Sequence, residues 1–312
     1  MAPDGRSLVT AVGSEQSTVW LHTSKGERQI SSEAFAYQPS FSPDGKTLYY
    51  LVRNGSGKFS GELTSVDLTS DRKEELVPRI PITRYAVSPD SRTAVFTRAD
   101  DDISALWISR LDKRASPRRL VSSEAEMPMF SRAGEVFFVG YEGRAGHIFR
   151  IRQDGGGLQK LVPEETETLV SISPDDRWIV AATTINKPQR QQNVIAYSLQ
   201  GAHRRVLYRK SGLGRWDTLL SPPYISWSAD QKAIYFAQPT DQTKTVVVPV
   251  RPAEPFPHLS GNELADEQVL SKIPGARLLD STTVFPGPNA DTYAILRRST
   301  QRNLYRIGLP SQ

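Results

Sequence analysis

The stretch Ser42–Val52, SPDGKTLYYLV, joins a tight turn to a short apolar strand. Pro43 fixes the φ angle that the first corner of a turn needs, Asp44 can bond nearby backbone amides, and Gly45 takes a positive φ at little cost. The run 48–51 that follows is apolar or aromatic at every position, whereas a strand with one face in water alternates. The stretch therefore predicts a strand that is buried on both faces and begins just after a tight turn.

This turn recurs along the whole chain at intervals of roughly 43 residues, which is the period of a β-propeller blade. Its copies are Pro3-Asp4-Gly5, Ser42-Pro43-Asp44-Gly45, Ser88-Pro89-Asp90-Ser91, Ser131-Arg132-Ala133-Gly134, Ser173-Pro174-Asp175-Asp176 and Ser228-Ala229-Asp230-Gln231, with a degenerate copy at 286–291. Four short runs rich in β-branched and aromatic residues surround most copies, as expected for antiparallel strands. A small sheet of this kind needs neighbours to cover both of its faces, and stacking around an axis supplies them.

The sequence thus predicts an all-β chain that forms a single β-propeller domain over 1–312, with seven blades of four antiparallel strands. The expected blades span 1–31, 37–78, 84–122, 127–163, 168–208, 223–260 and 277–310. Blade one lacks its inner strand, because only Met1 and Ala2 precede the first turn, and blade seven stops after its third strand near Leu309. The seam between them is expected to be incomplete. A segment upstream of Met1 in a longer protein would close it and cover the exposed edges.

Two insertions interrupt the repeat, at 210–223 and at 252–276. The second contains a predicted helix over 260–275, where Ser260 and Glu263 form a capping box and Pro274-Gly275 ends the helix. Its apolar face consists of Ala265, Val269, Leu270 and Ile273. We expect this helix to pack on the rim, with a partner-binding element as the alternative. The fourth strand of blade six is faint and is placed at 256–259.

Composition excludes several classes of protein. A charged fraction of 23% with 22 prolines and 21 glycines is too low for a disordered chain. The absence of cysteine excludes disulfides and thiolate catalysis. The apolar runs are far shorter than the about 20 residues that a membrane span needs. A net charge of +5 permits anionic partners, but the basic clusters at 110–119 and 204–210 are interleaved with acids, so no nucleic-acid partner is expected.

No motif for catalysis, cofactor binding or metal binding stands out. The four histidines have no second histidine at ligand spacing, and no Gly-x-Ser-x-Gly elbow is present. The run 54–58 lacks the first glycine and the Ser/Thr of a phosphate loop, and 100–102 lacks the glycine and distal glutamate of a calcium loop. Asp44, Asp90 and Asp175 could be ligands or acids, but one turn per blade explains all of them. We therefore expect no catalytic residue, no cofactor and no metal.

The Ser-Pro-Asp-Gly turn, the aromatic-rich strand and a later strand such as Ala105-Leu106-Trp107-Ile108-Ser109 together resemble the WD40-like (PD40) repeat of TolB-type β-propellers. The resemblance covers about 2–310. The tail at 301–307, followed by Leu309-Pro310, is similar to the C-terminal end of propellers fused to bacterial serine/threonine kinases. These resemblances imply an extracytoplasmic part of a bacterial signalling protein, although no kinase motif lies in the chain.

The resemblance also implies a binding face, where the first strands begin and where the second-to-third-strand loops lie. The candidates on that face combine arginines with aromatic residues, which binding hot spots favour. They are Tyr37, Arg84, Tyr85, Arg190, Arg215 and Trp216. The expected function is a monomeric, non-catalytic domain that binds protein or peptide. The alternatives are the substrate-gating propeller of a prolyl-oligopeptidase-like peptidase, and a free-standing enzyme with its site in the funnel.

Overall fold

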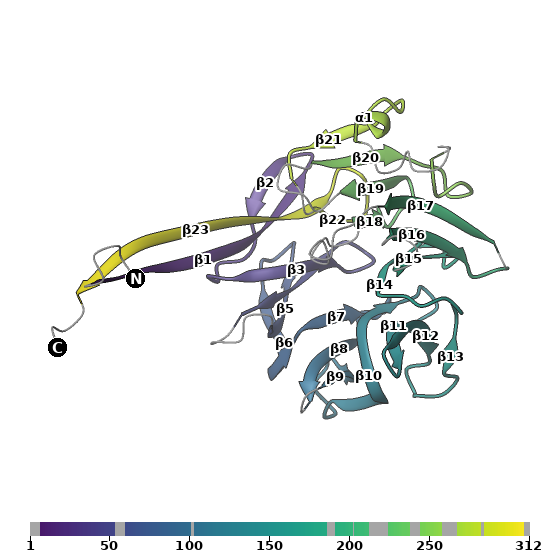
Figure 1. Ribbon diagram of the computed structural model, residues 1–312, viewed down its shortest axis with the longest axis horizontal. Coiled ribbons are helices and arrows are strands. Elements are labelled where there is room, and N and C mark those ends of the chain that lie inside the picture. The colour runs from purple at the N-terminus through teal and green to yellow at the C-terminus, as the bar shows by residue number, and fades with distance from the viewer. Residues whose placement is uncertain are drawn as a thin grey trace.

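The computed structural model describes residues 7–53, 60–100, 103–185, 191–201, 203–211, 224–237, 244–257, 267–281 and 284–308. Their strands form a β-propeller (Figure 1). Four sheets have four strands and one has seven, because β10 (Arg118–Phe130) is long enough to pair with β9 at its start and with β11 at its end. Counting β10 in both of the units that it joins, the described strands form six four-stranded units.

Five units run from inner to outer strand in chain order. The first contains β3 (Ala36–Phe41), β4 (Thr47–Val52), β5 (Gly61–Asp67) and β6 (Lys73–Ile82), and the second contains β7 (Arg84–Val87), β8 (Thr93–Asp100), β9 (Ile103–Arg110) and the start of β10. The third contains the end of β10 with β11 (Val136–Glu142), β12 (Ala145–Ile151) and β13 (Gln159–Lys160). The fourth contains β14 (Thr168–Ile172), β15 (Trp178–Ile185), β16 (Gln191–Ser198) and β17 (Arg204–Ser211), and the fifth contains β18 (Tyr224–Trp227), β19 (Ala233–Ala237), β20 (Thr245–Pro249) and β21 (Arg277–Leu279).

The sixth unit joins the two ends of the chain and corrects the predicted count of seven blades. Its strand order is β2-β1-β23-β22, with β1 at Ser7–Thr23, β2 at Gly26–Gln29, β22 at Val284–Pro286 and β23 at Tyr293–Gly308. The segments expected as blade one and blade seven are therefore two halves of one sheet. This sheet has its four strands, so the gap expected at the seam is not present among the described strands.

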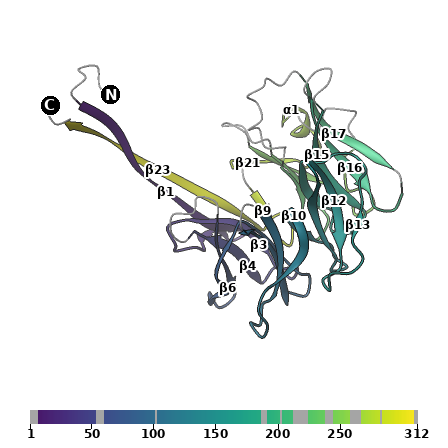
Figure 2. The same ribbon diagram turned by 60° about the horizontal axis from the view of Figure 1, so that its bottom comes forward.

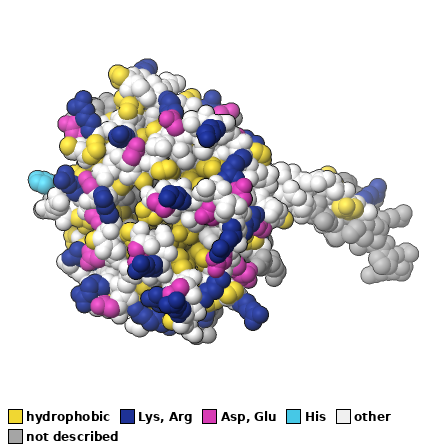
Figure 3. All heavy atoms as spheres, turned by 180° about the vertical axis from the view of Figure 1, so that it is seen from behind, with side chains coloured by type: hydrophobic (Ala, Val, Ile, Leu, Met, Phe, Trp, Pro, Cys, Tyr) yellow, Lys and Arg dark blue, Asp and Glu magenta, His cyan; other side chains and the backbone are white. Residues whose placement is uncertain are grey.

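The polar run at 13–17 explains the error, because it resembles a turn between two strands but lies inside the single strand β1. β1 and β23 pair without a register shift from Ser7 opposite Gly308 to His22 opposite Tyr293. The outer part of this pair projects from the body of the propeller as a two-stranded ribbon (Figures 1 and 2). In the space-filling view it is a narrow arm (Figure 3). Polar residues are compatible with such a ribbon because both of its faces meet water.

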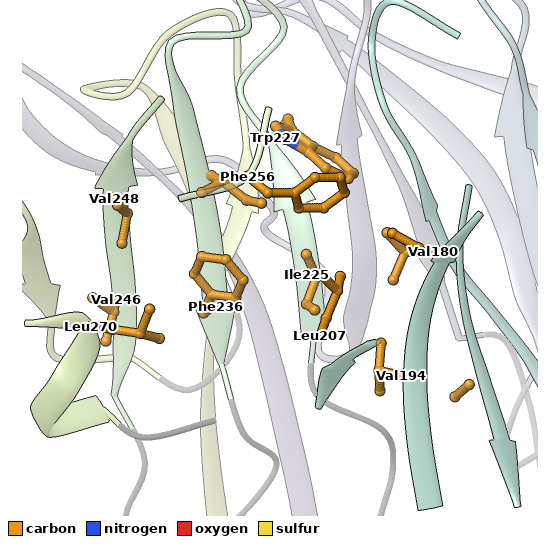
Figure 4. Close-up of a cluster of buried hydrophobic side chains, with 13 residues drawn as sticks. Val180, Val194, Leu207, Ile225, Trp227, Phe236, Val246, Val248, Phe256 and Leu270 are labelled. Carbon is orange, nitrogen blue, oxygen red and sulfur yellow. The ribbon is translucent and has the colours of Figure 1, made fainter. Parts of the chain in front are cut away.

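The second strand of each unit is sandwiched between neighbouring units, as the sequence predicts. In β4, Leu48 and Tyr50 belong to one buried cluster, whereas Tyr49 and Leu51 belong to another. The same alternation separates the side chains of β11 into two clusters. Figure 4 shows a further cluster, in which side chains of the β14–β17 unit meet those of the β18–β21 unit. Apolar side chains on both faces of these strands thus form the contacts between units.

The turn motif has the structural role expected from its residues. In the first complete copy, Ser42 Oγ donates to Asp44 Oδ1 at 2.6 Å, Lys46 N donates to the same oxygen, and Thr47 N donates to Ser42 Oγ at 2.9 Å. The same three bonds recur in the other copies that have both Ser and Asp, at 88–93, 173–178 and 228–233. These aspartates therefore order their own turns.

The second insertion differs in part from its prediction. α1 covers only Glu267–Leu270, and the expected cap residues Ser260 and Glu263 lie outside the described residues. Leu270 is buried against the β18–β21 unit, which agrees with packing on the rim. No helix in the described ranges is long and apolar enough to cross a membrane.

The fourth strand of this unit is β21, which pairs with β20, rather than the segment predicted at 256–259. Phe256 belongs instead to the core between two units. The centroid of its ring lies 5.4 Å from that of the Trp178 ring and 5.5 Å from that of the Trp227 ring, and both contacts are edge-on. Figure 4 shows Phe256 beside Trp227. Aromatic contacts of this kind add to the gain from burial. The apolar residue that suggested a strand is therefore part of the core.

Candidate functional site

One face of the propeller carries the starts of the inner strands and the connections between second and third strands. In the β7–β10 unit this face is marked by Arg84, which pairs with Thr97, and by the β8–β9 hairpin, in which Asp100 pairs with Ile103. We call it the recess face. The opposite face carries the Ser-Pro-Asp-Gly turns, and we call it the turn face. The recess face corresponds to the face on which the sequence places the candidate binding residues.

A recess of about 500 Å³ opens on the recess face between neighbouring units. It is lined by Thr83, Arg84, Thr97, Ala99, Ile103, Ser104, Glu126 and Met127. Arg84 is exposed, and Ile103 is 37% exposed. One recess thus contains both a cation and an apolar surface.

Hydrogen bonds fix the walls of the recess. The hydroxyl groups of Thr83 and Thr97 lie 2.8 Å apart, within hydrogen-bond distance. On the opposite wall, Tyr141 donates its hydroxyl hydrogen to Glu126 Oε2 at 3.2 Å. Burial, followed by the negative charge of Glu126, raises the pKa of Tyr141 to about 12, so this phenol stays protonated as a donor. The carboxylate of Glu126 is therefore held in place at the edge of the recess.

Tyr85, one of the predicted site residues, connects two inner strands. Its hydroxyl group donates to Gln38 O at 2.7 Å and lies 3.0 Å from Ser40 Oγ, while Gln38 Nε2 donates to Thr83 O at 3.2 Å. These bonds link β3 to β7 across the boundary between two units. Burial raises the pKa of the Tyr85 phenol far above its usual value. Its hydroxyl group is therefore committed to contacts inside the propeller.

Tyr37 lies in a small aromatic and cationic cluster at the start of β3. Its ring meets Phe35 edge-on at 5.9 Å, and the guanidinium carbon of Arg53 lies 3.4 Å from the centroid of the Phe35 ring. The Tyr37 hydroxyl is buried and has no hydrogen-bond partner among the described residues. Burial raises its pKa to about 12, although the positive charges of Arg53 and Arg84 oppose the shift. Tyr37 and Arg84 are thus near enough to interact electrostatically.

Phe35 and Arg53 were not predicted from the sequence. Arg53 N donates to Phe35 O at 2.9 Å, one step beyond the register pair of Ala36 and Val52. The register of their strand pair shifts by one residue between Tyr37 and Ser40, so a register extended from the predicted strands without this bulge would not place the two side chains opposite each other. Neither residue taken alone indicates this contact from the sequence.

The remaining predicted residues, Arg190, Arg215 and Trp216, lie outside the described residues. The structure therefore brings Tyr37, Arg84 and Tyr85 to the boundary between the β3–β6 and β7–β10 units. Within the described ranges, no group of three or more His, Asp or Glu side chains could hold a metal ion.

Inner strands on both sides of this region contain bulges. Gln38 and Met127 have positive φ angles of 51° and 54°, each precedes a proline, and each marks a shift in the register of its strand pair. A proline cannot donate a hydrogen bond to the ladder, so it is placed where the ladder is interrupted. The bulge at Met127 bends β10, the strand that forms one wall of the recess, and so changes the direction of its side chains there.

No family model matches this chain, and no curated protein matches it. Among solved structures, a putative TolB from Agrobacterium tumefaciens is similar with a TM-score of 0.61 and 15% identity, over 92% of this chain and 99% of that one. TolB from Acinetobacter baumannii gives a TM-score of 0.58 and 13% identity, over 75% of this chain but only 61% of that one. An oligogalacturonate lyase in complex with manganese gives 0.50 and 14%, over 91% and 80%. At these identities the likeness concerns the fold alone, and this chain has the fold of the TolB-like β-propellers.

Proposed function

We propose that this chain is a non-catalytic β-propeller that binds a protein or peptide segment on the recess face. The observation that supports this proposal most directly is the recess itself, which is lined by both the exposed Arg84 and the partly exposed Ile103. Arginine is enriched among the residues that contribute most to the affinity of protein interfaces, and burying apolar surface against a partner is favourable. A recess of about 500 Å³ can accept a few side chains of a peptide.

The lining favours a particular kind of peptide. Arg84 offers planar N–H donors to a carboxylate, either of a side chain or of a chain terminus. Ile103 and Ala99 offer apolar surface for an adjacent aliphatic or aromatic side chain. Glu126 lies on the other wall and disfavours a second carboxylate there. We therefore propose a ligand segment in which one carboxylate follows or precedes an apolar residue.

We extend the proposal to the larger protein: the propeller would be the sensory or scaffolding part of a bacterial signalling protein that carries a kinase. The support for this step is the tail at 301–307 and its similarity to kinase-linked propellers. The competing role is substrate gating in a prolyl-oligopeptidase-like peptidase. The coding sequence upstream separates the two, because kinase and membrane-span motifs support the first and a Gly-x-Ser-x-Gly domain supports the second.

The binding face is tested by selecting peptides on the intact propeller from a random display library and measuring their affinity by fluorescence anisotropy. The double variant Arg84→Ala/Ile103→Asp should lose at least about tenfold in affinity. The matched double variant Arg132→Ala/Leu158→Asp removes an arginine and a large aliphatic residue from exposed positions on the turn face and should keep the affinity of the unaltered chain. Failure to enrich any peptide, or equal loss in both variants, would contradict the proposal.

A further inference from the structure

The ribbon formed by β1 and β23 leaves the propeller at Ser17. This residue is fully buried, its Oγ donates to Ala36 O at 2.8 Å, and its backbone N donates to Ala34 O at 3.1 Å. On the same stretch of ribbon, the guanidinium carbon of Arg297 lies 3.9 Å from the centroid of the Trp20 ring. Beyond these anchors the two strands continue to pair out to Ser7 and Gly308. The projecting part is thus a continuation of a firmly held sheet (Figure 2).

One face of the projecting ribbon is basic. Side chains two residues apart in a strand lie on the same face, so Arg298, Arg302 and Arg306 share a face, and all three are exposed. The register places Ser17, Gly13 and Val9 opposite them, and Glu15 opposite Thr300. Among the residues that the structure describes, three guanidinium groups therefore share this face with one carboxylate, that of Glu15. Within the described residues, Arg298 and Arg302 form no ion pair, with Glu15 or with any other acid.

The outer edge of β23 is open along the same stretch. β22 pairs with β23 only at Tyr293–Ile295, so from Leu296 onwards the edge away from β1 has no strand beside it among the described residues. An edge of this kind presents backbone N–H and C=O groups that another extended chain can pair with. Leu304, on the basic face, is 77% exposed and offers an apolar contact between two of the arginines.

We propose that the edge of β23 at 298–306 is a docking strand for an acidic, extended segment of a partner protein. The segment would add as a third strand to the ribbon, and its carboxylates would lie on the face that carries Arg298, Arg302 and Arg306. Opposite charges directly across a strand pair stabilise a sheet, and the backbone ladder supplies the rest of the affinity.

Two other occupants fit this edge less well. A second copy of β23 in antiparallel pairing would bring arginines opposite arginines, which destabilises the pair. A nucleic acid would satisfy the positive charge but would leave the open ladder of backbone donors and acceptors unpaired. Of these three occupants, only an acidic polypeptide can both pair its carboxylates with the arginines of the face and form backbone hydrogen bonds with the open edge.

The experiment uses a short fluorescein-labelled peptide that alternates glutamate with valine, and measures its anisotropy with the full chain. Its controls are the same peptide with glutamine for glutamate, an N-methylated form that cannot pair as a strand, and a labelled DNA duplex. The glutamate peptide should bind, and each of the two altered peptides should bind at least about tenfold more weakly. The variant Arg298→Glu/Arg302→Glu should lose binding by a similar factor.

The matched variant Arg79→Glu/Arg209→Glu changes the net charge equally at exposed positions away from the ribbon and should leave binding unchanged. Circular dichroism of both variants checks that the propeller is folded. The proposal is overturned if the glutamate peptide does not bind at up to about 1 mM, if the N-methylated peptide binds equally well, or if the duplex binds and the peptide does not. A dimer in sedimentation that Arg298→Glu/Arg302→Glu strengthens, without peptide binding, would also overturn it.

Discussion

The carboxylate of Asp176 accepts hydrogen bonds from the backbone N–H groups of the turn at Arg132, in the neighbouring unit. The two distances are 2.8 Å from Arg132 N and 2.9 Å from Ala133 N. The turn at 131–134 is the copy that lacks both the proline and the aspartate of the motif, so its backbone donors have no carboxylate of their own. A side chain from the next turn along the chain supplies one. The degenerate copy keeps the bond from Glu135 N to its own Ser131 Oγ, and its neighbour adds two further hydrogen bonds.

The other degenerate copy shows the same principle. Ala229 stands where the motif has proline, and its freed N–H donates to Gly287 O at 3.0 Å in the neighbouring turn. Asp230 N donates to Pro288 O at 3.1 Å. Departures from the motif therefore coincide with hydrogen bonds between adjacent turns on the turn face.

The variant Asp176→Gly should destabilise the propeller by about 1–3 kcal/mol, because two backbone donors lose a charged acceptor. Glycine is chosen because Asp176 has a φ of 56°, so any relief of backbone strain works against the expected loss. The control is Gln231→Gly, at the equivalent turn position with a φ of 61°, which should stay within about 0.5 kcal/mol of the unaltered chain. Urea unfolding measures both, and equal stability of the two variants would refute this role of Asp176.

The variants Phe137→Ala and Phe138→Ala should each cost about 3–5 kcal/mol. These neighbours point to opposite faces of β11 and are 1% and 2% exposed, because each face packs against a different unit. Either loss is large beside a typical total stability of about 5–15 kcal/mol. Thermal or urea unfolding separates this fold from one with a water-covered strand face, in which only one of the two substitutions would matter.

The variant Tyr85→Phe should lower the free energy of unfolding by about 1 kcal/mol without changing peptide affinity. It removes the hydroxyl that donates to Gln38 O, whereas the ring and the recess-lining Arg84 remain. Urea unfolding and anisotropy are measured on the same preparation. A loss of affinity with unchanged stability would instead place the Tyr85 hydroxyl in the binding site.

Acid should weaken the turns that contain the motif. Hydrogen bonds from Ser42 and Ser88 lower the pKa of Asp44 and of Asp90 below their usual value. A carboxyl group with a lowered folded-state pKa adds stability above its unfolded pKa, and that stability is lost as pH falls through the folded value. The unfolding free energy should therefore be flat from neutral pH down to about pH 5 and fall below about pH 4.

The double variant Ser42→Ala/Ser88→Ala removes the largest cause of the lowered pKa values of Asp44 and Asp90. Its free energy of unfolding should therefore fall less steeply as the pH decreases below about 4. Urea unfolding at a series of pH values measures this slope. Parallel curves for the variant and the unaltered chain would show that the turns do not contribute to the pH dependence.

The propeller could be predicted because its second strands carry an unusually local signal. Residues 47–52 and 233–237 are bounded by a turn motif and are apolar on both faces, and β4 and β19 have those same bounds. The closure of the ring could not be predicted in this way. The pairing of Ser17 with Arg298 joins residues far apart in the sequence, and polar residues around them match a turn as well as an exposed ribbon.

The predicted site residues that the structure describes differ in their contacts. Arg84 lines the recess. Tyr85 instead connects β3 with β7, because its hydroxyl group donates a hydrogen bond to Gln38 O in the neighbouring unit. Phe35 and Arg53 depend on a cross-strand register, and Glu126 depends on the bulge at Met127. Contacts of this kind depend on how the sheets assemble, and no local sequence pattern predicts them.

Hydrogen–deuterium exchange of the propeller, with and without a peptide selected for binding to it, tests the proposed binding face most directly. Protection from exchange should appear at 83–86, at 97–100 and 103–104, and at 125–127, which surround the recess. The turn-face segments 42–47, 88–93 and 173–178 should exchange at the same rate in both samples. Protection of the turn face, with no change around Arg84, would contradict the account.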